Sequence, residues 1–241
     1  MTGAAGAEAD RRAEIADGLA AVRQRIADAC AAAGRQPAEI TLIGVTKTFP
    51  ASDVRLLAGL GVTDVGENRD ADAAPKARAC ADLPLTWHFV GQLQTNKVRS
   101  VVGYAGVVHS VDRARLVGAL DREAARAGRT LTCLVQVNLD PDPEPGRGGA
   151  VPAEVPALAD AIAGSGSLRL GGVMAVAPLG ADPLDAFTRL AATAADTRER
   201  HPGATIVSAG MSGDLEQAIA CGATHIRVGT ALLGYRAGRV G

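Results

Sequence analysis

Two alternating patterns of apolar residues run along this chain, one typical of strands and the other typical of helices. Short runs rich in Val, Ile, Leu and Thr are each followed by a longer stretch in which apolar residues recur every three or four positions. This alternation indicates parallel strands that are joined by amphipathic helices. The runs predict strands at about 41–46, 62–66, 86–90, 106–111, 131–139, 168–176, 205–209 and 224–228.

The number of these strand–helix units predicts the fold. About eight of them fill roughly 200 residues without a leftover segment, which favours a closed (β/α)8 TIM barrel. An open doubly wound sheet is the alternative, but no break in composition divides the chain into halves. We expect a single domain over 1–241, with residues 1–9 disordered. An extra N-terminal helix over about 10–33, covering one end of the core, is indicated by the spacing of Ile15, Leu19, Val22, Ile26 and Cys30.

Composition and charge exclude several classes of protein. The 25 basic and 26 acidic residues give a net charge of −1 without a long run of one sign, so nothing favours nucleic acid or a membrane surface. No apolar run approaches the ~20 residues of a membrane-spanning helix, and no signal peptide is visible. The four cysteines lie far apart, which predicts reduced thiols and no metal site. We expect a cytoplasmic protein that is a monomer or a weak dimer.

The first predicted strand ends in a lysine, Lys47. It shares a strand face with Ile43 and Val45, because strand side chains alternate. A lysine at the end of a buried strand loses solvation, which favours the neutral, nucleophilic amine. Such an amine forms a Schiff base with an aldehyde or another carbonyl compound. The alternative is that Lys47 simply extends from the strand end into water.

The loops after the seventh and eighth strands contain residues that suit an anion. Gly210–Asp214 (Gly-Met-Ser-Gly-Asp) and Gly229–Ala231 (Gly-Thr-Ala) each combine glycine with a hydroxyl residue at a predicted helix start. In (β/α)8 barrels these two loops often hold a phosphate group. Ordinary turns and helix caps use the same residues, so that alternative stays open.

Three polar residues in or after predicted strands are further candidates. Arg227, in the eighth strand, stays charged and needs a partner. It could face solvent between helices, form a salt bridge in the core, or donate to the ring nitrogen of a cofactor. Asn68 follows the second strand and either caps the next helix or points at a ligand. His88, in the third strand, is of a type more often found as a hydrogen-bonded core residue than as a catalyst.

Lysine, phosphate loops and cationic donor together match pyridoxal 5′-phosphate (PLP). This cofactor needs a Schiff base, a phosphate site and a partner for its ring nitrogen. A Schiff-base lyase acting on a sugar phosphate would use the first two features but has no need of the third. The residues therefore favour PLP as the cofactor.

Eight short blocks of residues, spread over about 10–236, carry a resemblance to a known protein family and follow one another in the same order as in that family. They are 45–48 (Val-Thr-Lys-Thr), 66–69 (Gly-Glu-Asn-Arg), 87–97 (Trp-His-Phe-Val-Gly-Gln-Leu-Gln-Thr-Asn-Lys), 109–112 (His-Ser-Val-Asp), 136–138 (Gln-Val-Asn), 172–174 (Gly-Val-Met), 210–214 (Gly-Met-Ser-Gly-Asp) and 221–229 (Cys-Gly-Ala-Thr-His-Ile-Arg-Val-Gly). With these blocks the chain resembles the pyridoxal-phosphate homeostasis protein family, single-domain relatives of the barrel of alanine racemase (fold type III). The Trp-His-Phe block and the last two blocks are the most specific.

The resemblance implies a PLP site and a function. Lys47 would carry PLP as a Schiff base, Arg227 would face its ring nitrogen, and Asn68 would line the site. The phosphate would be held by Ser212, Gly229 and Thr230. The implied function is a carrier or regulator in intracellular PLP homeostasis, with apo PLP-dependent enzymes as partners and no established turnover. The chain departs from the family at 140–149, where a Pro-rich loop replaces a lysine-containing one.

The alternative function is an amino-acid racemase that uses the same cofactor. Racemisation needs an acid or base on each face of the substrate, and Lys47 could serve only one face. The racemases that this chain resembles take the opposite base, a tyrosine, from a second domain. Here Tyr104 precedes the fourth strand at the wrong end of the barrel, and Tyr235 follows the eighth. His88 has no orienting carboxylate visible in the sequence, so we expect a carrier without racemase activity.

Overall fold

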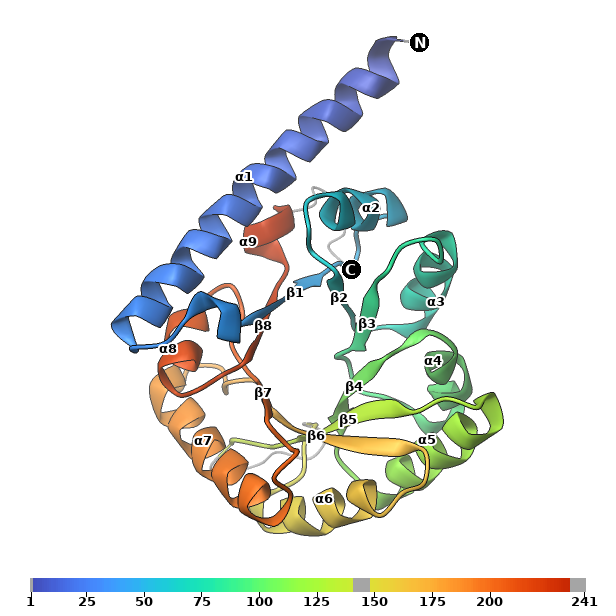
Figure 1. Cartoon of the computed structure of the whole chain (residues 1–241), viewed down its shortest axis with the longest axis vertical. Coiled ribbons are helices and arrows are strands. Elements are labelled where there is room, and N and C mark those ends of the chain that lie inside the picture. The colour runs from blue at the N-terminus through green and yellow to red at the C-terminus, as the bar shows by residue number, and fades with distance from the viewer. Residues whose placement is uncertain (1, 141–147, 235–241) are drawn as a thin grey trace.

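The predicted strands close into a parallel barrel in the computed structural model, which describes residues 2–140 and 148–234 (Figure 1). Each strand pairs with the next in chain order, and the last pairs with the first, so the predicted (β/α)8 barrel is confirmed. Helical crossovers between neighbouring parallel strands produce this order. The strands are β1 (Thr41–Val45), β2 (Asp64–Glu67), β3 (Thr86–Phe89), β4 (Val107–Val111), β5 (Leu131–Gln136), β6 (Leu168–Met174), β7 (Ile206–Ser208) and β8 (His225–Val228).

Helices form the outer layer and turn their apolar sides towards the strands. In α5, Leu116 and Leu120 are fully buried, whereas Arg115 and Arg122 are exposed. The helices are α1 (Thr2–Ala32), α2 (Ala51–Gly59), α3 (Asp70–Ala79), α4 (Val98–Tyr104), α5 (Ala114–Ala127), α6 (Val155–Ala163), α7 (Pro183–Arg200), α8 (Leu215–Ala220) and α9 (Thr230–Leu233). None of the described helices is both long and apolar enough to cross a membrane.

Alternate residues of each strand point into the barrel. A Cβ on Gly66 would lie 3.1 Å from the Ile43 side chain, whereas a Cβ on Gly44 would meet side chains of the helix layer, so Gly66 and Ile43 face inwards. The strand register places Arg227 opposite Ile43 and His88 opposite Gly66. The interior therefore holds charged and imidazole groups, at a level where such barrels are usually packed with branched aliphatic side chains.

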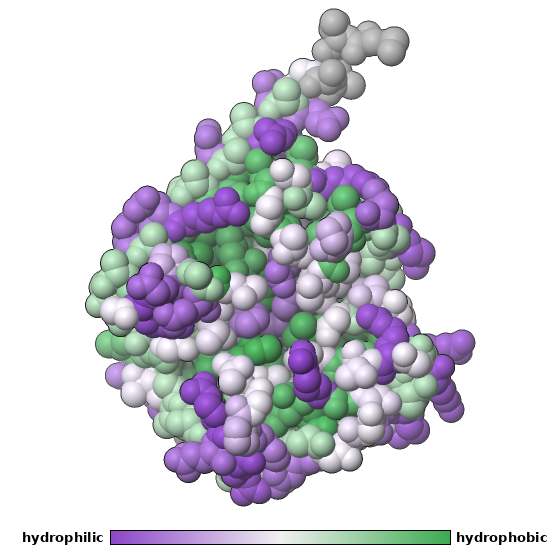
Figure 2. Space-filling model, viewed as in Figure 1, coloured by the Kyte–Doolittle hydropathy of each residue, from purple (hydrophilic) through white to green (hydrophobic). Residues whose placement is uncertain are grey.

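The long helix α1 covers the junction of β1 and β8, because α9 after β8 has only four residues (Figure 1). It packs against α8 and α9 with the apolar stripe from Ile15 to Ile26 buried. Hydrophobic residues gather where α1 meets the barrel (Figure 2). Gly18 permits this close approach, since a Cβ there would lie 2.6 Å from the Leu232 carbonyl oxygen. The predicted helix is confirmed, but it lies along the side of the barrel and not over an end.

Element boundaries differ from the predicted ones where burial continues beyond strand pairing. β2 begins at Asp64 and β5 ends at Gln136, although Val62 and Leu139 outside them are also buried. A run of apolar residues indicates burial, whereas the ends of a strand are defined by its backbone hydrogen bonds to neighbouring strands. α1 begins at Thr2, earlier than the start near residue 10 that the sequence indicates. Most of the predicted Pro-rich loop lies outside the described residues.

Candidate functional site

Lys47 lies two residues beyond the last residue of β1, and its side chain is exposed. The ladder continues for one residue after the strand, since the Thr46 N–H donates to the Gly66 carbonyl oxygen (2.9 Å). The chain then turns sharply, with a φ of 70° at Thr48, a region that a β-branched residue rarely adopts. The prediction that Lys47 loses solvation is therefore wrong, because the turn carries it out of the buried strand. Its amine is open to a ligand from solution.

The chain has only three lysines, and they lie in different surroundings. Lys76 of α3 forms a salt bridge with buried Glu67. Lys97 lies in the short turn before α4 and lines a cavity between α3 and α4 on the outside of the barrel, next to Trp87. Lys47 is therefore the one lysine at the carboxyl-terminal end of a barrel strand.

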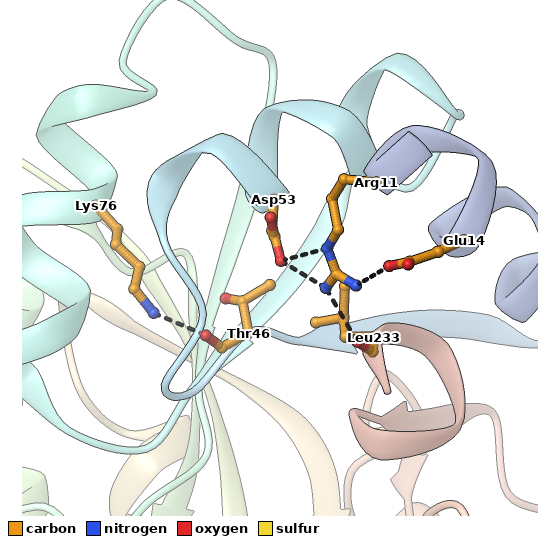
Figure 3. Close-up of polar contacts among 6 residues, drawn as sticks. All are labelled: Arg11, Glu14, Thr46, Asp53, Lys76 and Leu233. Carbon is orange, nitrogen blue, oxygen red and sulfur yellow. Dashed lines mark hydrogen bonds and ion pairs between the residues drawn. The ribbon is translucent and has the colours of Figure 1, made fainter. Parts of the chain in front are cut away.

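A buried ion pair holds the residue before Lys47. Lys76 donates to the Thr46 carbonyl oxygen (2.7 Å; Figure 3) and to Glu67 Oε1 (2.6 Å). The Thr46 hydroxyl donates to the same carboxylate oxygen (2.6 Å). The Glu67 side chain is fully buried and that of Lys76 is 11% exposed, so solvent screens this pair little. These contacts fix the backbone from which Lys47 projects.

Arg11 of α1 holds the same turn from its other side (Figure 3). Its guanidinium donates to Asp53 Oδ2 in α2 (2.7 Å) and to the Leu233 carbonyl oxygen in α9 (3.0 Å). It also lies 5.6 Å from the ring centre of Phe49, which is two residues after Lys47, in a cation–π contact. Three elements that are distant in sequence thus meet at the turn.

The loops after β7 and β8 meet next to the end of β1. The Ala231 N–H donates to Ser212 Oγ (3.3 Å), so the two loops predicted to hold phosphate are in contact. A Cβ on Gly229 would lie 3.2 Å from the Val45 carbonyl oxygen, which places this glycine against β1. Thr230 is exposed at the start of α9. The structure therefore brings together the two loops that carry the predicted phosphate residues, next to Val45 at the end of β1.

Arg227 lies inside the barrel and is only 4% exposed. It donates to Ser208 Oγ (2.6 Å) and to the Ala175 carbonyl oxygen (2.8 Å). Burial lowers the pKa of Arg227 to about 10, against the opposing effect of the Asp214 charge. The guanidinium is thus protonated at neutral pH, and it can only donate hydrogen bonds. The solvent-facing placement is therefore wrong, and in the interior Arg227 bonds to neutral oxygens where the sequence had allowed for a salt bridge.

Asn68 follows directly after β2 and is half-buried. A Cβ on Gly91, in the loop after β3, would lie 2.1 Å from the Asn68 carbonyl oxygen, so only glycine fits there. This packing fixes the Asn68 backbone at the carboxyl-terminal end of the barrel. Asn68 does not cap α3, because Arg69 occupies the cap position and no side-chain cap bond forms.

A chain of polar groups, which sequence reasoning missed, extends from Arg227 through the barrel interior. Asp64 Oδ1 lies 2.9 Å from His88 Nε2, and His88 Nδ1 lies 2.8 Å from His109 Nε2. His109 Nδ1 lies 3.0 Å from Ser208 Oγ. The expectation that His88 lacks an orienting carboxylate is therefore wrong. Asp64 could have been found from the register of β2 and β3, whereas the contact from β4 to β7 crosses the interior and leaves no signal in the sequence.

The side chains considered as a second base for racemisation are placed elsewhere or already engaged. Tyr104 ends α4 and packs edge-on against Trp87 in the helix layer, with ring centres 6.3 Å apart. Both ring nitrogens of His88 lie within hydrogen-bond distance of other side chains. Tyr235 lies outside the described residues. Throughout 2–140 and 148–234, no three His, Cys, Asp or Glu side chains are arranged to hold a metal ion.

Comparison with known proteins identifies the family of this chain. The family profile "Alanine racemase, N-terminal domain" matches residues 18–237. The chain is 43% identical to the pyridoxal phosphate homeostasis protein of Mycobacterium leprae, over 94% of this chain and 95% of that protein, and 41% identical to the protein of the same name from Pseudomonas aeruginosa, over 92% and 96%. The structure of PipY from Synechococcus elongatus, solved with PLP bound, is 36% identical with a TM-score of 0.78, and the match covers 91% of this chain and 100% of that one. The chain therefore belongs to the alanine racemase N-terminal domain family and, within it, to the pyridoxal phosphate homeostasis proteins.

Proposed function

We propose that this protein binds PLP as a Schiff base on Lys47 and acts as a carrier or regulator of this cofactor in PLP homeostasis. One observation carries the proposal. The exposed lysine at the end of β1 lies next to the joined loops after β7 and β8, which present Ser212, Gly229 and Thr230. A primary amine beside an anion-binding loop is what an aldehyde that carries a phosphate requires.

The donor set fits each part of PLP. The hydroxyls of Ser212 and Thr230, with backbone N–H groups at the start of α9, suit a phosphate dianion. Gly229 lacks the Cβ that would crowd the approach between this loop and β1. Arg227 offers only donors, which matches a ring nitrogen that keeps its lone pair. When bound, PLP supplies an aldehyde that condenses with amines and a ring whose electron withdrawal depends on protonation of its nitrogen.

Each residue of the site then has a physical role. Lys76 and Glu67 hold the Thr46 backbone, so the Lys47 amine starts from a fixed anchor. Arg227 prefers an unprotonated ring nitrogen, because a guanidinium cannot accept the proton that a pyridinium would donate. Asn68 lines the same end of the barrel, positioned by its contact with Gly91.

A carrier role fits the site better than catalytic racemisation. A racemase needs a second acid or base opposite the lysine. Neither Tyr104 nor His88 supplies one, because the first packs in the helix layer and the second has both ring nitrogens engaged. We therefore infer that the bound cofactor is held for release, with apo PLP-dependent enzymes as recipients. Racemisation of alanine or serine should be no faster than with free PLP, and complete racemisation that His88→Ala abolishes would favour the enzyme.

Borohydride reduction followed by peptide mass mapping tests the proposal directly. The purified protein incubated with PLP should show a visible absorption band, and reduction should fix one PLP mass on the peptide that contains Lys47. Lys47→Ala should fold and lose both the band and the adduct, because the exposed side chain contributes little to the core. Lys97→Ala is the matched control, since it removes another exposed lysine and should keep both signals. An adduct on Lys97 or Lys76, or none at all, would overturn the assignment.

A further inference from the structure

The buried chain from Asp64 to Arg227 has donors and acceptors that can be assigned in one direction only. Its four links measure 2.9, 2.8, 3.0 and 2.6 Å, and they join Asp64, His88, His109, Ser208 and Arg227 in that order. The four interior side chains are at most 4% exposed, whereas the Asp64 side chain is 26% exposed. The chain thus starts near solvent at the amino-terminal end of β2 and ends at the guanidinium predicted to face the cofactor.

The two ends fix the direction. Burial raises the pKa of Asp64, but the hydrogen bond with His88 acts against burial and the net pKa is lowered, so the carboxylate is ionised at neutral pH. An ionised carboxylate only accepts, so His88 Nε2 carries the proton. At the other end Arg227 only donates, so Ser208 Oγ accepts from it.

The interior links follow from these ends. Ser208 Oγ accepts from Arg227, so its own hydroxyl proton is donated to His109 Nδ1, its other partner in the chain. Burial holds the pKa of His109 well below its ordinary value, so this ring is neutral, its one proton lies on Nε2, and His88 Nδ1 accepts it. Every donor in the chain then has one acceptor.

The opposite direction fails at both ends. The lone pair of His88 Nε2 would face the Asp64 carboxylate, so two acceptors would meet. Ser208 Oγ would accept from both His109 and Arg227, which would leave its hydroxyl proton without an acceptor in this chain. A buried donor or acceptor without a partner is destabilising. The observed distances are therefore explained by one arrangement of protons.

We propose that Asp64, His88, His109 and Ser208 are positioning residues that orient Arg227 through this one-way hydrogen-bond chain. Within the described residues Arg227 forms no ion pair; the charge of Asp214 acts on it from a distance, and the hydrogen-bond chain links it to the carboxylate of Asp64. Each link turns its acceptor towards the guanidinium and its donor towards the carboxylate, so the aligned dipoles stabilise both charges. The inference rests on the proposed function only in its last step, that Arg227 meets the ring nitrogen of PLP.

Nitrogen-15 NMR of histidine in the cofactor-free protein tests the direction of the chain. His88 and His109 should each carry one ring proton, placed on Nε2. Asp64→Asn keeps an acceptor oxygen and should preserve this tautomer, whereas Asp64→Leu removes the acceptor and should shift His109 towards the Nδ1–H form. Asp82→Leu, which removes an acid of the exposed Arg55 pair, is the control and should change neither histidine. A cationic His88, or either wild-type histidine protonated on Nδ1, would refute the proposed direction of the hydrogen-bond chain, whether or not PLP binds.

Binding of PLP labelled with nitrogen-15 tests the positioning role separately. In the wild type the ring nitrogen should be unprotonated. Ser208→Ala removes only the hydroxyl that accepts from Arg227, and should weaken PLP binding about tenfold and move the ring-nitrogen shift. If Lys47 forms its adduct but Ser208→Ala leaves both the affinity and the shift unchanged, the positioning role is wrong. If no adduct forms on Lys47, the proposed function fails, whereas the histidine tautomers still test the direction of the hydrogen-bond chain.

Discussion

The ion pair beneath the Lys47 turn offers a sharp test, through the substitution Lys76→Met. Methionine keeps most of the length of the side chain but removes the ammonium group, so Glu67 keeps only the Thr46 hydroxyl as a hydrogen-bond partner among the described residues. Glu67 Oε2 already has no partner there, and the side chain is fully buried. The variant therefore leaves an uncompensated carboxylate in the protein interior.

Breaking a buried pair from one side typically costs about 3–5 kcal/mol, and the low exposure of both partners places Lys76→Met in that range. For a domain of this size each kcal/mol lowers the melting temperature by about 2–4 °C, so a fall of roughly 6–20 °C is expected. In the double variant, Glu67→Gln should recover part of the lost free energy of unfolding, because it removes the unpaired negative charge and keeps an oxygen that accepts from the Thr46 hydroxyl. The coupling energy of the cycle should then be at least about 1.5 kcal/mol.

Urea unfolding followed by tryptophan fluorescence is the appropriate assay. Trp87 is the only tryptophan, and it packs in the same apolar cluster as Ala77 and Cys80, at the end of α3. Arg55→Met is the control, because it breaks an exposed pair with Asp82 and should leave the unfolding curve unchanged. The reasoning would be refuted if Lys76→Met lowered the free energy of unfolding by less than about 1 kcal/mol. It would also be refuted if the loss in the double variant equalled the sum of the losses in the two single variants.

Three further outcomes are expected. Ser212→Ala and Thr230→Ala should each weaken PLP binding about tenfold, as equilibrium titration would show, and unchanged affinity in the double variant would place the phosphate elsewhere. Gly91→Ala should lower both the melting temperature and PLP affinity, because its Cβ would lie 2.1 Å from the Asn68 carbonyl oxygen. A variant with the melting temperature and affinity of the wild type would contradict that packing. Burial lowers the pKa of His225 to about 4, so the unfolded state binds more protons between that pH and about 6.5. Stability should therefore fall on acidification through this window, and His225→Gln should flatten the pH dependence measured by urea unfolding.

The features that the sequence predicts correctly are those that neighbouring residues encode. Strand and helix alternation follows from local periodicity, and it was enough to predict the barrel. The neighbouring positions of the Ser212 and Gly229 loops could be predicted because barrel topology gives loops after the seventh and eighth strands a defined place. The structure confirms that these loops are neighbours, because the Ala231 N–H in one donates to Ser212 Oγ in the other.

The features that the sequence did not reveal depend on contacts across the barrel. Lys47 was expected at the end of a buried strand, but the turn at Thr48 exposes it, and a β-branched residue at positive φ leaves no pattern to read. The pairing of Glu67 with Lys76 joins a strand end to a helix on the outer side of the sheet. The approach of His109 to Ser208 spans the interior between strands that are not neighbours, so neither local pattern nor strand order predicts it.

The position of α1 has a consequence for the order in which the protein is built. This helix is synthesised first, but the helices that cover its apolar stripe, α8 and α9, are synthesised last. At about 5–20 residues per second, the stripe from Ile15 to Ile26 waits roughly 10–40 s for its partners. Contacts of such large sequence separation form slowly, so pulse-labelled hydrogen exchange should find α1 protected after the central strands. Because α1 also holds the Lys47 turn through Arg11 and the Ser212 loop through Arg25, the nascent chain completes the candidate site only when α1 meets α8 and α9.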